Sequence, residues 1–202
     1  MEPAMKYEMM SWEGFHRLAR ELALRILDSG YRPDMVVAIA RGGVVPARVL
    51  CDYLDVMEMN YVRIEHYRAR KMTPQARVKY PLNASVDNLR ILVVDDICDT
   101  GDSFIAAIEH LREKGAPLEV RTCAMQHKTV SKFVPDYYVE EITEWRWVTY
   151  PWAVVEDLGE LIEDGGLQDS SPEKIAGALR EKYGIEATRE QIEDAVGTLH
   201  LS

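Results

Sequence analysis

The chain has 202 residues, of which 47% are hydrophobic, and a formal net charge of −10. This length suffices for one full core plus a small second unit, and the acidic balance argues against general nucleic-acid binding. No apolar run approaches the roughly 18 residues of a membrane-spanning helix, residues 1–6 lack a signal-peptide pattern, and three cysteines without C-x-x-C spacing favour reduced thiols in a cytoplasm over a zinc site.

The first elements predicted along the chain are a helix, a buried strand and a second, shorter helix. Residues 11–27 carry an apolar stripe at helical spacing, with Ser11 as the N-cap and Gly30 as the stop. Residues 35–40 are almost wholly apolar, which is typical of a parallel strand covered on both faces. A short helix over 46–54 is expected to follow.

Between this strand and the second helix lies the loop Arg41-Gly42-Gly43. Paired glycines let the backbone approach a ligand closely, and the N-terminus of the next helix offers unpaired backbone N–H groups. We therefore expect the loop to bind an anion. A plain tight turn is the alternative, because Gly-Gly after a strand also serves that purpose.

The next stretch predicts a strand over 57–63 and then a basic segment. Residues 63–79 contain six Lys or Arg and one acid, Glu65. No strand pattern is evident, and Pro74 and Pro81 indicate a long loop, so we expect a flexible lid over about 64–88 that covers a polyanionic substrate. A solvated basic loop without function is the alternative.

The most informative stretch lies near the middle of the chain. An apolar run, Ile91 to Val94, is followed by Asp95-Asp96-Ile97-Cys98-Asp99-Thr100-Gly101-Asp102-Ser103 and an amphipathic helix over 103–114. A strand, loop and helix in this order offer unpaired N–H groups at the carboxyl edge of a parallel sheet, where a phosphate can bind. Two carboxylates repel a phosphate unless sugar hydroxyls or a divalent cation are also bound. A phosphorylated ribose with a magnesium-bound pyrophosphate supplies both.

This stretch resembles the phosphoribosyl-pyrophosphate (PRPP) binding motif of type I phosphoribosyltransferases, which reads two aliphatic residues, Asp-Asp, three residues, Thr-Gly, one residue, Ser or Thr. The resemblance implies an α/β fold in which helices flank a central, mostly parallel sheet with a small hood. It also implies Mg²⁺ as cofactor, held mainly through ribose hydroxyls or water, and PRPP and a purine base as partners. The residues implied to bind PRPP and its 5'-phosphate are Asp95, Asp96, Thr100, Gly101, Asp102 and Ser103, with Asp95 and Asp96 also nearest the metal.

The same resemblance implies roles for other positions. Asp99 corresponds to the general base that receives the proton of purine N7. The residues Arg41, Gly42 and Gly43 correspond to the pyrophosphate loop, with a non-proline cis peptide at Ala40-Arg41. His66 and Tyr67 stand where the lid often carries Ser-Tyr. Asp102 replaces the family's frequent Gly, so its side chain must point away from the phosphate.

A purine site is implied by two later segments. A strand over 119–125 ends at Gln126-His127-Lys128, and in 6-oxopurine enzymes of this family a Lys at such a position donates to purine O6 and N7, which implies that role for Lys128. The run 147–152 resembles the W-[IV]-x-x-P-W segment of xanthine-guanine enzymes. It implies that Trp147 stacks on the purine and that the Val148 carbonyl faces the 2-position.

The expected organisation is one catalytic domain followed by a helical appendage. The predicted parts are a phosphoribosyltransferase domain over 1–163 with a short strand at 136–139 and a hood at about 140–160, a linker over 164–171, and a helical hairpin over 172–202. Ser171 and a capping box formed by Thr188 and Gln191 open the two helices. Four basic and nine acidic residues from 163 onward argue against a DNA-binding helix-turn-helix, so we expect a packing or dimer-contact element.

The predicted function is transfer of the phosphoribosyl group of PRPP to hypoxanthine, xanthine or guanine, and family resemblance implies a homodimer or higher homo-oligomer. Two alternatives stay open: a non-catalytic PRPP-sensing regulator of the same fold, and a phosphoribosyltransferase for another base such as adenine. Asp99, Lys128 and Trp147 together favour the enzyme, because a PRPP sensor needs no purine platform. Lys128 suits an oxo group at C6 better than an amino group. The sequence does not rank the three 6-oxopurines.

Overall fold

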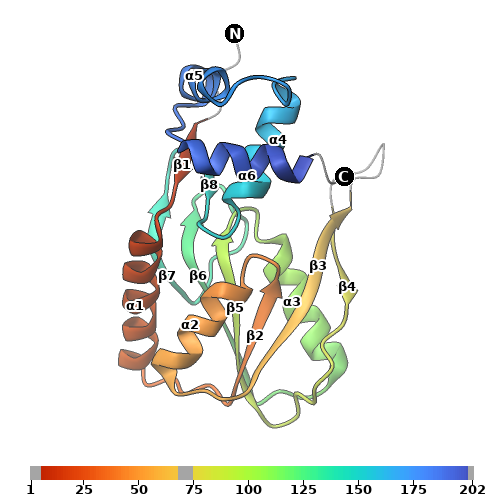
Figure 1. Ribbon diagram of the computed structural model, residues 1–202. Helices are drawn as coiled ribbons and strands as arrows, with labels where there is room; N and C mark the ends of the chain where they lie inside the picture. The colour runs from red at the N-terminus through yellow and green to blue at the C-terminus, as the bar shows by residue number, and fades with distance from the viewer. Residues whose placement is uncertain (1–5, 68–74, 200–202) are drawn as a thin grey trace. The chain divides into compact units, whose positions relative to one another are not determined.

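The computed structural model describes residues 6–67 and 75–199 and divides the chain into two compact units. One unit comprises residues 16–144, and the other comprises residues 1–15 together with 145–202. The predicted α/β class with a central, mostly parallel sheet is confirmed (Figure 1). Within the described ranges, no helix is both long and apolar enough to cross a membrane.

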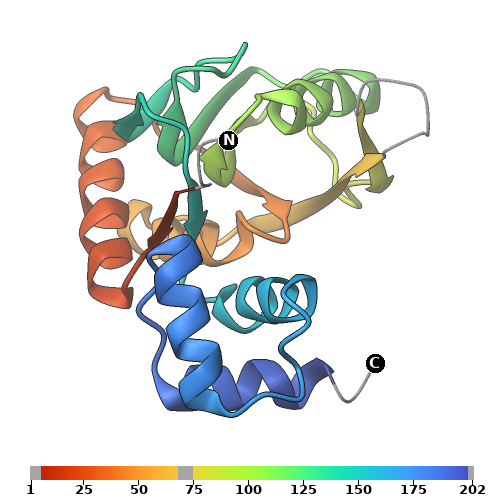
Figure 2. The ribbon, with the colours of Figure 1, turned by 90° about the horizontal axis from the view of Figure 1, so that it is seen from above.

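The unit of residues 16–144 is built on a six-stranded sheet in the order β4-β3-β2-β5-β6-β7. All neighbouring strands pair in parallel except β3 and β4, which are antiparallel. Its elements are α1 (Trp12–Asp28, whose first turn belongs to the other unit), β2 (Met35–Ala40), α2 (Val44–Leu54), β3 (Met59–Tyr67), β4 (Gln75–Tyr80), β5 (Arg90–Cys98), α3 (Asp102–Lys114), β6 (Glu119–Lys128) and β7 (Tyr137–Ile142). Helices α2 and α3 lie on opposite faces of this sheet (Figure 2), so its central strands are buried on both sides.

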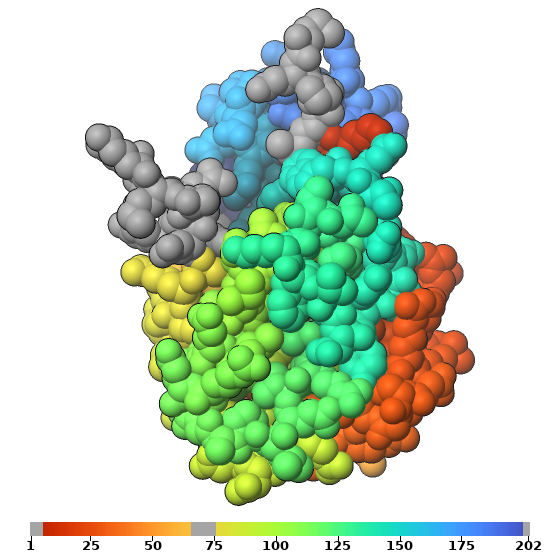
Figure 3. All heavy atoms as spheres, turned by 180° about the vertical axis from the view of Figure 1, so that it is seen from behind, coloured from red at the N-terminus to blue at the C-terminus, as the bar shows by residue number. Residues whose placement is uncertain are grey.

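The central strands are apolar because both of their faces pack against helices. Residues 91–94 of β5 and 36–38 of β2 are fully buried. Under α3, Phe104, Ala107 and Leu111 join the apolar side chains of β2, β3 and β5 in one core cluster. From behind, α3 and the segment that leads to β7 form a continuous outer surface of this unit (Figure 3).

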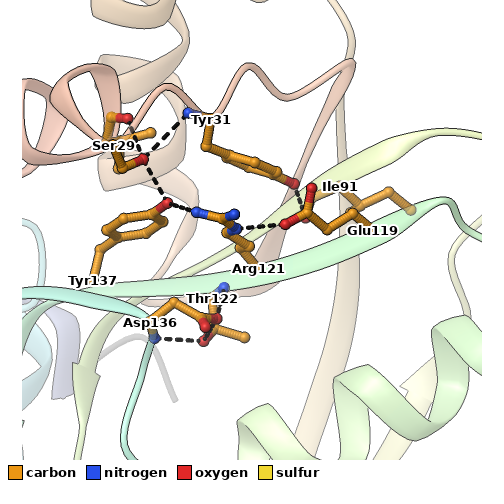
Figure 4. A network of polar contacts seen from close by, with 9 residues as sticks. Ser29, Tyr31, Ile91, Glu119, Arg121, Thr122, Asp136 and Tyr137 are labelled. Atoms are coloured by element: carbon orange, nitrogen blue, oxygen red, sulfur yellow. Dashed lines mark hydrogen bonds and ion pairs between the residues drawn. The ribbon is translucent and has the colours of Figure 1, made fainter.

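A network of polar contacts connects the segment after the C-terminus of α1 to the sheet, at the edge where β5, β6 and β7 begin (Figure 4). The Arg121 guanidinium lies 4.6 Å from the centroid of the Tyr31 ring and donates to the Tyr137 hydroxyl. The hydroxyls of Tyr137 and Ser29 are 2.7 Å apart, and the Tyr31 hydroxyl donates to the Ile91 carbonyl at 2.8 Å. Burial raises the pKa of Tyr31, which keeps this donor protonated. The network therefore supports the sheet from the edge opposite the carboxyl ends of its strands.

The expectation that residues 63–79 lack strand structure is wrong. Strand β3 continues to Tyr67, and β4 returns antiparallel to it over Gln75–Tyr80. Small and branched apolar residues at every second position of both strands pack on the α3 side of the sheet. The basic residues alternate with them, and Glu65 pairs with Arg77 at 3.3 Å and with Lys79 at 2.8 Å. The alternation was present in the sequence but was concealed by the high charge of the segment.

The end of strand β5 also differs from the sequence prediction. Strand β5 runs to Cys98, so Asp95 and Asp96 belong to the strand rather than to the loop after it. The reason is that β5 stays paired in parallel with β6 beyond the apolar run, with Cys98 opposite His127. Residues 68–74, part of the predicted lid, lie outside the described residues.

The second unit combines a two-stranded parallel sheet with three helices. Strand β1 (Tyr7–Met9) pairs with β8 (Trp147–Thr149), and the helices are α4 (Val154–Asp164), α5 (Pro172–Tyr183) and α6 (Arg189–Leu199). The two predicted C-terminal helices are confirmed, whereas β1 and α4 were not predicted. Apolar residues of α4, α5 and α6 form one core cluster, against which Tyr7 and Met9 also pack. The predicted linker at 164–171 lies within this unit, between α4 and α5.

The predicted caps of the C-terminal helices are present. The Ser171 hydroxyl accepts from the Lys174 N–H, and Gly184 ends α5 in the left-handed region at φ 70°. Thr188 and Gln191 form a reciprocal capping box, with the Thr188 N–H donating to the Gln191 side chain at 2.9 Å and the Gln191 N–H donating to the Thr188 hydroxyl at 3.2 Å. Local capping chemistry therefore fixes where both helices begin.

Candidate active site

The acidic pair at the end of β5 is held by its own backbone. The Asp96 N–H donates to Asp95 Oδ1 at 3.0 Å, and the Ile97 N–H donates to Asp96 Oδ1 at 2.8 Å. Asp95 is buried, and the pKa of its carboxyl is raised well above its usual range by desolvation and by the charge of Asp96. A bound cation or bound hydroxyl groups would favour the ionised form of both carboxyls, and the sequence predicts such a ligand beside them.

The Gly-Gly loop after β2 lies directly against this acidic pair. A Cβ atom added to Gly42 would come within 2.3 Å of the Asp96 carboxylate. At Gly43 an added Cβ would meet the Val94 carbonyl oxygen at 2.3 Å and the Asp95 Cα at 3.0 Å. The peptide between Ala40 and Arg41 is cis, as the resemblance implied. The Gly-Gly loop therefore packs directly on the acidic end of β5, and backbone atoms leave no room for a side chain at Gly43.

We expect the substitution Gly43→Ala to destabilise the protein by about 1 to 3 kcal/mol, because the atoms in its way are backbone atoms that cannot rotate aside. Thermal or urea unfolding measures this change. Gly177→Ala in α5 is the matched control: an added Cβ there meets nothing within 4 Å, and alanine is favoured over glycine inside a helix. An unchanged free energy of unfolding for Gly43→Ala would contradict the close packing of the Gly-Gly loop on β5.

The loop between β5 and α3 forms a small cavity of about 180 Å³, lined by residues 95–101, Ser103 and Phe104. Gly101 has φ +86°, a left-handed conformation that side chains rarely adopt, and an added Cβ would come 2.3 Å from the Phe133 Cβ. Helix α3 begins at Asp102, so the N–H groups of its first turn have no carbonyl partner within the helix. This arrangement is suited to a phosphate.

Two residues with separate predicted roles meet beside this cavity. Lys128 Nζ, at the end of β6, lies 3.1 Å from Asp99 Oδ2. The Lys128 side chain is 2% exposed, whereas the Asp99 side chain is 38% exposed. A buried ammonium needs a partner of opposite charge, and here the partner is the predicted general base. The site therefore holds a hydrogen-bond donor, the Lys128 ammonium, beside an acceptor, the Asp99 carboxylate. Such a pair can bind the acceptor and donor atoms on one edge of a heterocycle.

The side chain of Asp102 turns toward a neighbouring loop. Its Oδ1 pairs with the Lys132 ammonium, and its Oδ2 accepts a hydrogen bond from the Thr100 hydroxyl at 2.9 Å. The cavity lining includes Gly101 and Ser103 but does not include Asp102. Lys132 was not recognised from the sequence, because 30 positions separate it from Asp102 and no local pattern links them.

In the second unit, Trp147 is fixed by a hydrogen bond that the sequence did not reveal. Its indole Nε1–H donates to Asp157 Oδ2 at 2.8 Å, and the Thr149 hydroxyl donates to the same oxygen at 2.6 Å. Burial raises the pKa of Asp157. The Trp147 side chain stays partly exposed, at 39%, so an ordered ring remains available to a ligand. The feature that could have revealed this hydrogen bond is the position of Asp157 in the first turn of α4, but that helix was not predicted.

The other two tryptophans of this segment differ in their surroundings. The Trp152 ring stacks on Tyr150, with ring centroids 5.0 Å apart, and meets the edge of Phe15 at 4.9 Å. It therefore contributes to packing in its unit, whereas Trp145 is 40% exposed.

The predicted site residues are distributed over both units. The acidic motif, the Gly-Gly loop and Lys128 belong to residues 16–144, and Trp147 and Val148 belong to the other unit. Val148 is buried within β8, beside Trp147. His66 and Tyr67 end β3, but their side chains lie outside the described part of the chain.

The chain is similar in sequence and in fold to known phosphoribosyltransferases. A family model described as "Phosphoribosyl transferase domain" matches residues 8–157. Xanthine-guanine phosphoribosyltransferases of Cereibacter sphaeroides and Idiomarina loihiensis are 30% and 29% identical, and each alignment covers 71% of this chain and 84% of the relative. Among solved structures, a purine phosphoribosyltransferase from Pyrococcus horikoshii has a TM-score of 0.65 at 28% identity, covering 73% of this chain and 94% of that one. A xanthine-guanine-hypoxanthine phosphoribosyltransferase of Helicobacter pylori also has a TM-score of 0.65, at 25% identity, covering 78% and 99%.

Proposed function

The chain belongs to the phosphoribosyltransferase family, and we propose that it transfers the phosphoribosyl group of PRPP to hypoxanthine, xanthine or guanine, a purine salvage reaction. The products are the nucleoside 5'-monophosphate and pyrophosphate. One observation carries the proposal: Lys128 Nζ lies 3.1 Å from Asp99 Oδ2 at the side of the phosphate cavity. A protonated amine beside a carboxylate matches the O6 acceptor and the N7–H donor of a 6-oxopurine.

In this proposal the acidic pair orients the sugar. Asp95 and Asp96 accept hydrogen bonds from the ribose hydroxyls, and the N–H groups from Thr100 to Ser103 bind the 5'-phosphate. The carboxylate oxygens of the pair are the kind of ligand that Mg²⁺ prefers. Among residues 6–67 and 75–199 no group of three or more His, Cys, Asp or Glu side chains that could hold a metal ion is present. Asp95 and Asp96 would hold Mg²⁺ mainly through the ribose hydroxyls or water. Mg²⁺ supplies charge neutralisation for the pyrophosphate.

The reaction follows from these positions. A purine nitrogen attacks C1 of the ribose, the bond from C1 to the pyrophosphate oxygen breaks, and its electron pair leaves with the pyrophosphate. The Arg41 to Gly43 loop donates to the departing oxygens, because charge develops there in the transition state. The Asp99 carboxylate receives the N7 proton as the other nitrogen attacks. Lys128 donates a hydrogen bond to O6 and thereby fixes the orientation of the base.

A regulator that binds PRPP without catalysis is the main competing function. Such a protein needs the acidic motif and the phosphate loop but has no use for a buried amine beside Asp99. The Lys128 side chain is 2% exposed, and burying an ammonium is costly, which favours a role in binding the base. An adenine enzyme is less favoured, because an ammonium cannot accept a hydrogen bond from a 6-amino group.

The test is the initial rate with Mg²⁺ and PRPP against hypoxanthine, xanthine, guanine and adenine in parallel, following nucleotide formation. We expect turnover with at least one 6-oxopurine at roughly 1 to 10³ per second and little with adenine. PRPP binding without turnover on any base would support the regulator instead.

Trp147 is proposed to stack on the purine, and Asp157 is proposed to orient its ring. We expect Asp157→Ala to raise the purine KM about five- to tenfold, the equivalent of one lost hydrogen bond, with kcat and the PRPP KM unchanged. Asp157→Asn keeps an acceptor and should stay close to the parent. Thr149→Val is the matched control, because it removes the other donor to the same oxygen. Equal losses for both substrates would contradict the assignment.

We also infer a homodimer. Tyr61 and Tyr80 lie on one face of the β3–β4 hairpin, opposite the side that packs on α3, and each is 61% exposed. Large aromatic side chains exposed on a sheet face are typical of protein contacts. Light scattering at micromolar concentration measures the mass directly, and a monomer at all concentrations would contradict the inference.

A further inference from the structure

The phosphate loop of this chain contains a residue that ought to weaken it. Asp102 is the first residue of α3, where the helix dipole and the unpaired N–H groups favour an anion. A carboxylate that reached into the same place would repel the 5'-phosphate of PRPP. Three further aspartates, at 95, 96 and 99, already line the cavity, so additional negative charge there is costly.

The Asp102 carboxylate makes its contacts outside the cavity lining. The Lys132 ammonium pairs with one oxygen, and the Thr100 hydroxyl donates to the other at 2.9 Å. Thr100 also belongs to the loop proposed to bind the phosphate, so a bound phosphate competes with Asp102 for its hydroxyl. The contact with the Lys132 ammonium does not involve that hydroxyl. Its side chain is 61% exposed, whereas that of Asp102 is 22% exposed.

The backbone of Lys132 is fixed independently of its side chain. The Lys132 N–H donates to the Thr100 carbonyl at 3.2 Å. The next residue, Phe133, stacks on Phe104 of α3 with ring centroids 5.3 Å apart and an interplanar angle of 8°. Ser131 Oγ lies 3.3 Å from the Cys98 thiol. Removing the charged end of Lys132 therefore leaves this loop in place and changes only the contact with Asp102.

We propose that Lys132 is a positioning residue that sets PRPP affinity by keeping the Asp102 carboxylate out of the 5'-phosphate site. The proposal rests on the proposed function, since it takes the β5–α3 loop as the phosphate site. It assigns no direct contact between Lys132 and the phosphate. The Lys132 end of the ion pair is exposed, so the pair is expected to contribute little to folding and to act on binding rather than on stability.

The test is a double-mutant cycle on Lys132 and Asp102, with PRPP affinity measured by calorimetry in the presence of Mg²⁺. We expect Lys132→Met to weaken PRPP binding about tenfold, with an unchanged melting temperature and purine KM, and Lys132→Arg to restore it. Asp102→Gly removes the repelling group and is expected to bind PRPP more tightly than the parent. In the Asp102→Gly background, Lys132→Met is expected to have no further effect.

The outcomes separate this proposal from its alternatives. If Lys132→Met weakens PRPP binding equally in the Asp102→Gly background, Lys132 acts on the phosphate directly and the proposal is wrong. No change in either background also overturns it. Lys114→Met, at the end of α3, removes the same charge outside this loop and controls for net charge. PRPP binding without turnover would contradict only the transfer reaction, whereas a parent protein that does not bind PRPP would overturn both.

Discussion

Replacing Asp99 with asparagine is expected to lower kcat about 10²-fold or more, the typical contribution of a general base. Asparagine has nearly the same shape but cannot take up the N7 proton at neutral pH. Because product release is rate-limiting in many enzymes, the chemical step should be measured in a single turnover, with enzyme in excess over purine. PRPP binding, which does not use this carboxylate, is expected to change little.

The neighbouring Lys128 makes a control for this substitution necessary. Asp99→Asn removes the charge that faces the Lys128 ammonium at 3.1 Å, so a loss could come from a displaced lysine rather than from a missing base. A displaced lysine would raise the purine KM, whereas a missing base lowers kcat at saturating purine. An unchanged single-turnover rate removes Asp99 from the role of base.

The central motif could be predicted from sequence because its determinants are local. An apolar run followed by two carboxylates and a Thr-Gly turn requires a strand, a loop and a helix in that order, whatever the rest of the chain does. The same holds for the helix caps at Ser171 and Thr188, since each cap is satisfied within four residues. Where the chemistry was local, predicted and observed elements agree within a few positions.

The features missed are those that depend on distant residues or on charge that masks a pattern. The Lys132–Asp102 and Trp147–Asp157 contacts join different elements, and no spacing rule links such pairs. Strand β4 was missed because Arg77 and Lys79 suggested a basic flexible lid, although they alternate with Ala76 and Val78, which pack on the core. Helix α4 carries Val154, Leu158 and Leu161 on one buried face, a helical pattern that the tryptophans before it obscured.

Lys128 should matter for the base and not for PRPP. The substitution Lys128→Met fills the same volume without the charge, so it avoids the cavity that alanine would leave at a position 2% exposed. We expect the KM for the 6-oxopurine to rise about 10²-fold, within the range for a lost charge-assisted hydrogen bond in a site with little water. The dissociation constant for PRPP, measured without purine, should change less than threefold.

The specificity of the Lys128 variant gives the sharper result. An ammonium favours an oxo group over an amino group at C6, because it donates to the first and has nothing to accept from the second. In Lys128→Met the rate with 6-oxopurines is therefore expected to fall, whereas any residual rate with adenine should change little. The preference for 6-oxopurines over adenine is lost for this reason. If affinity for PRPP falls as far as affinity for the base, the role of Lys128 lies in holding Asp99 and the phosphate loop rather than in reading the purine.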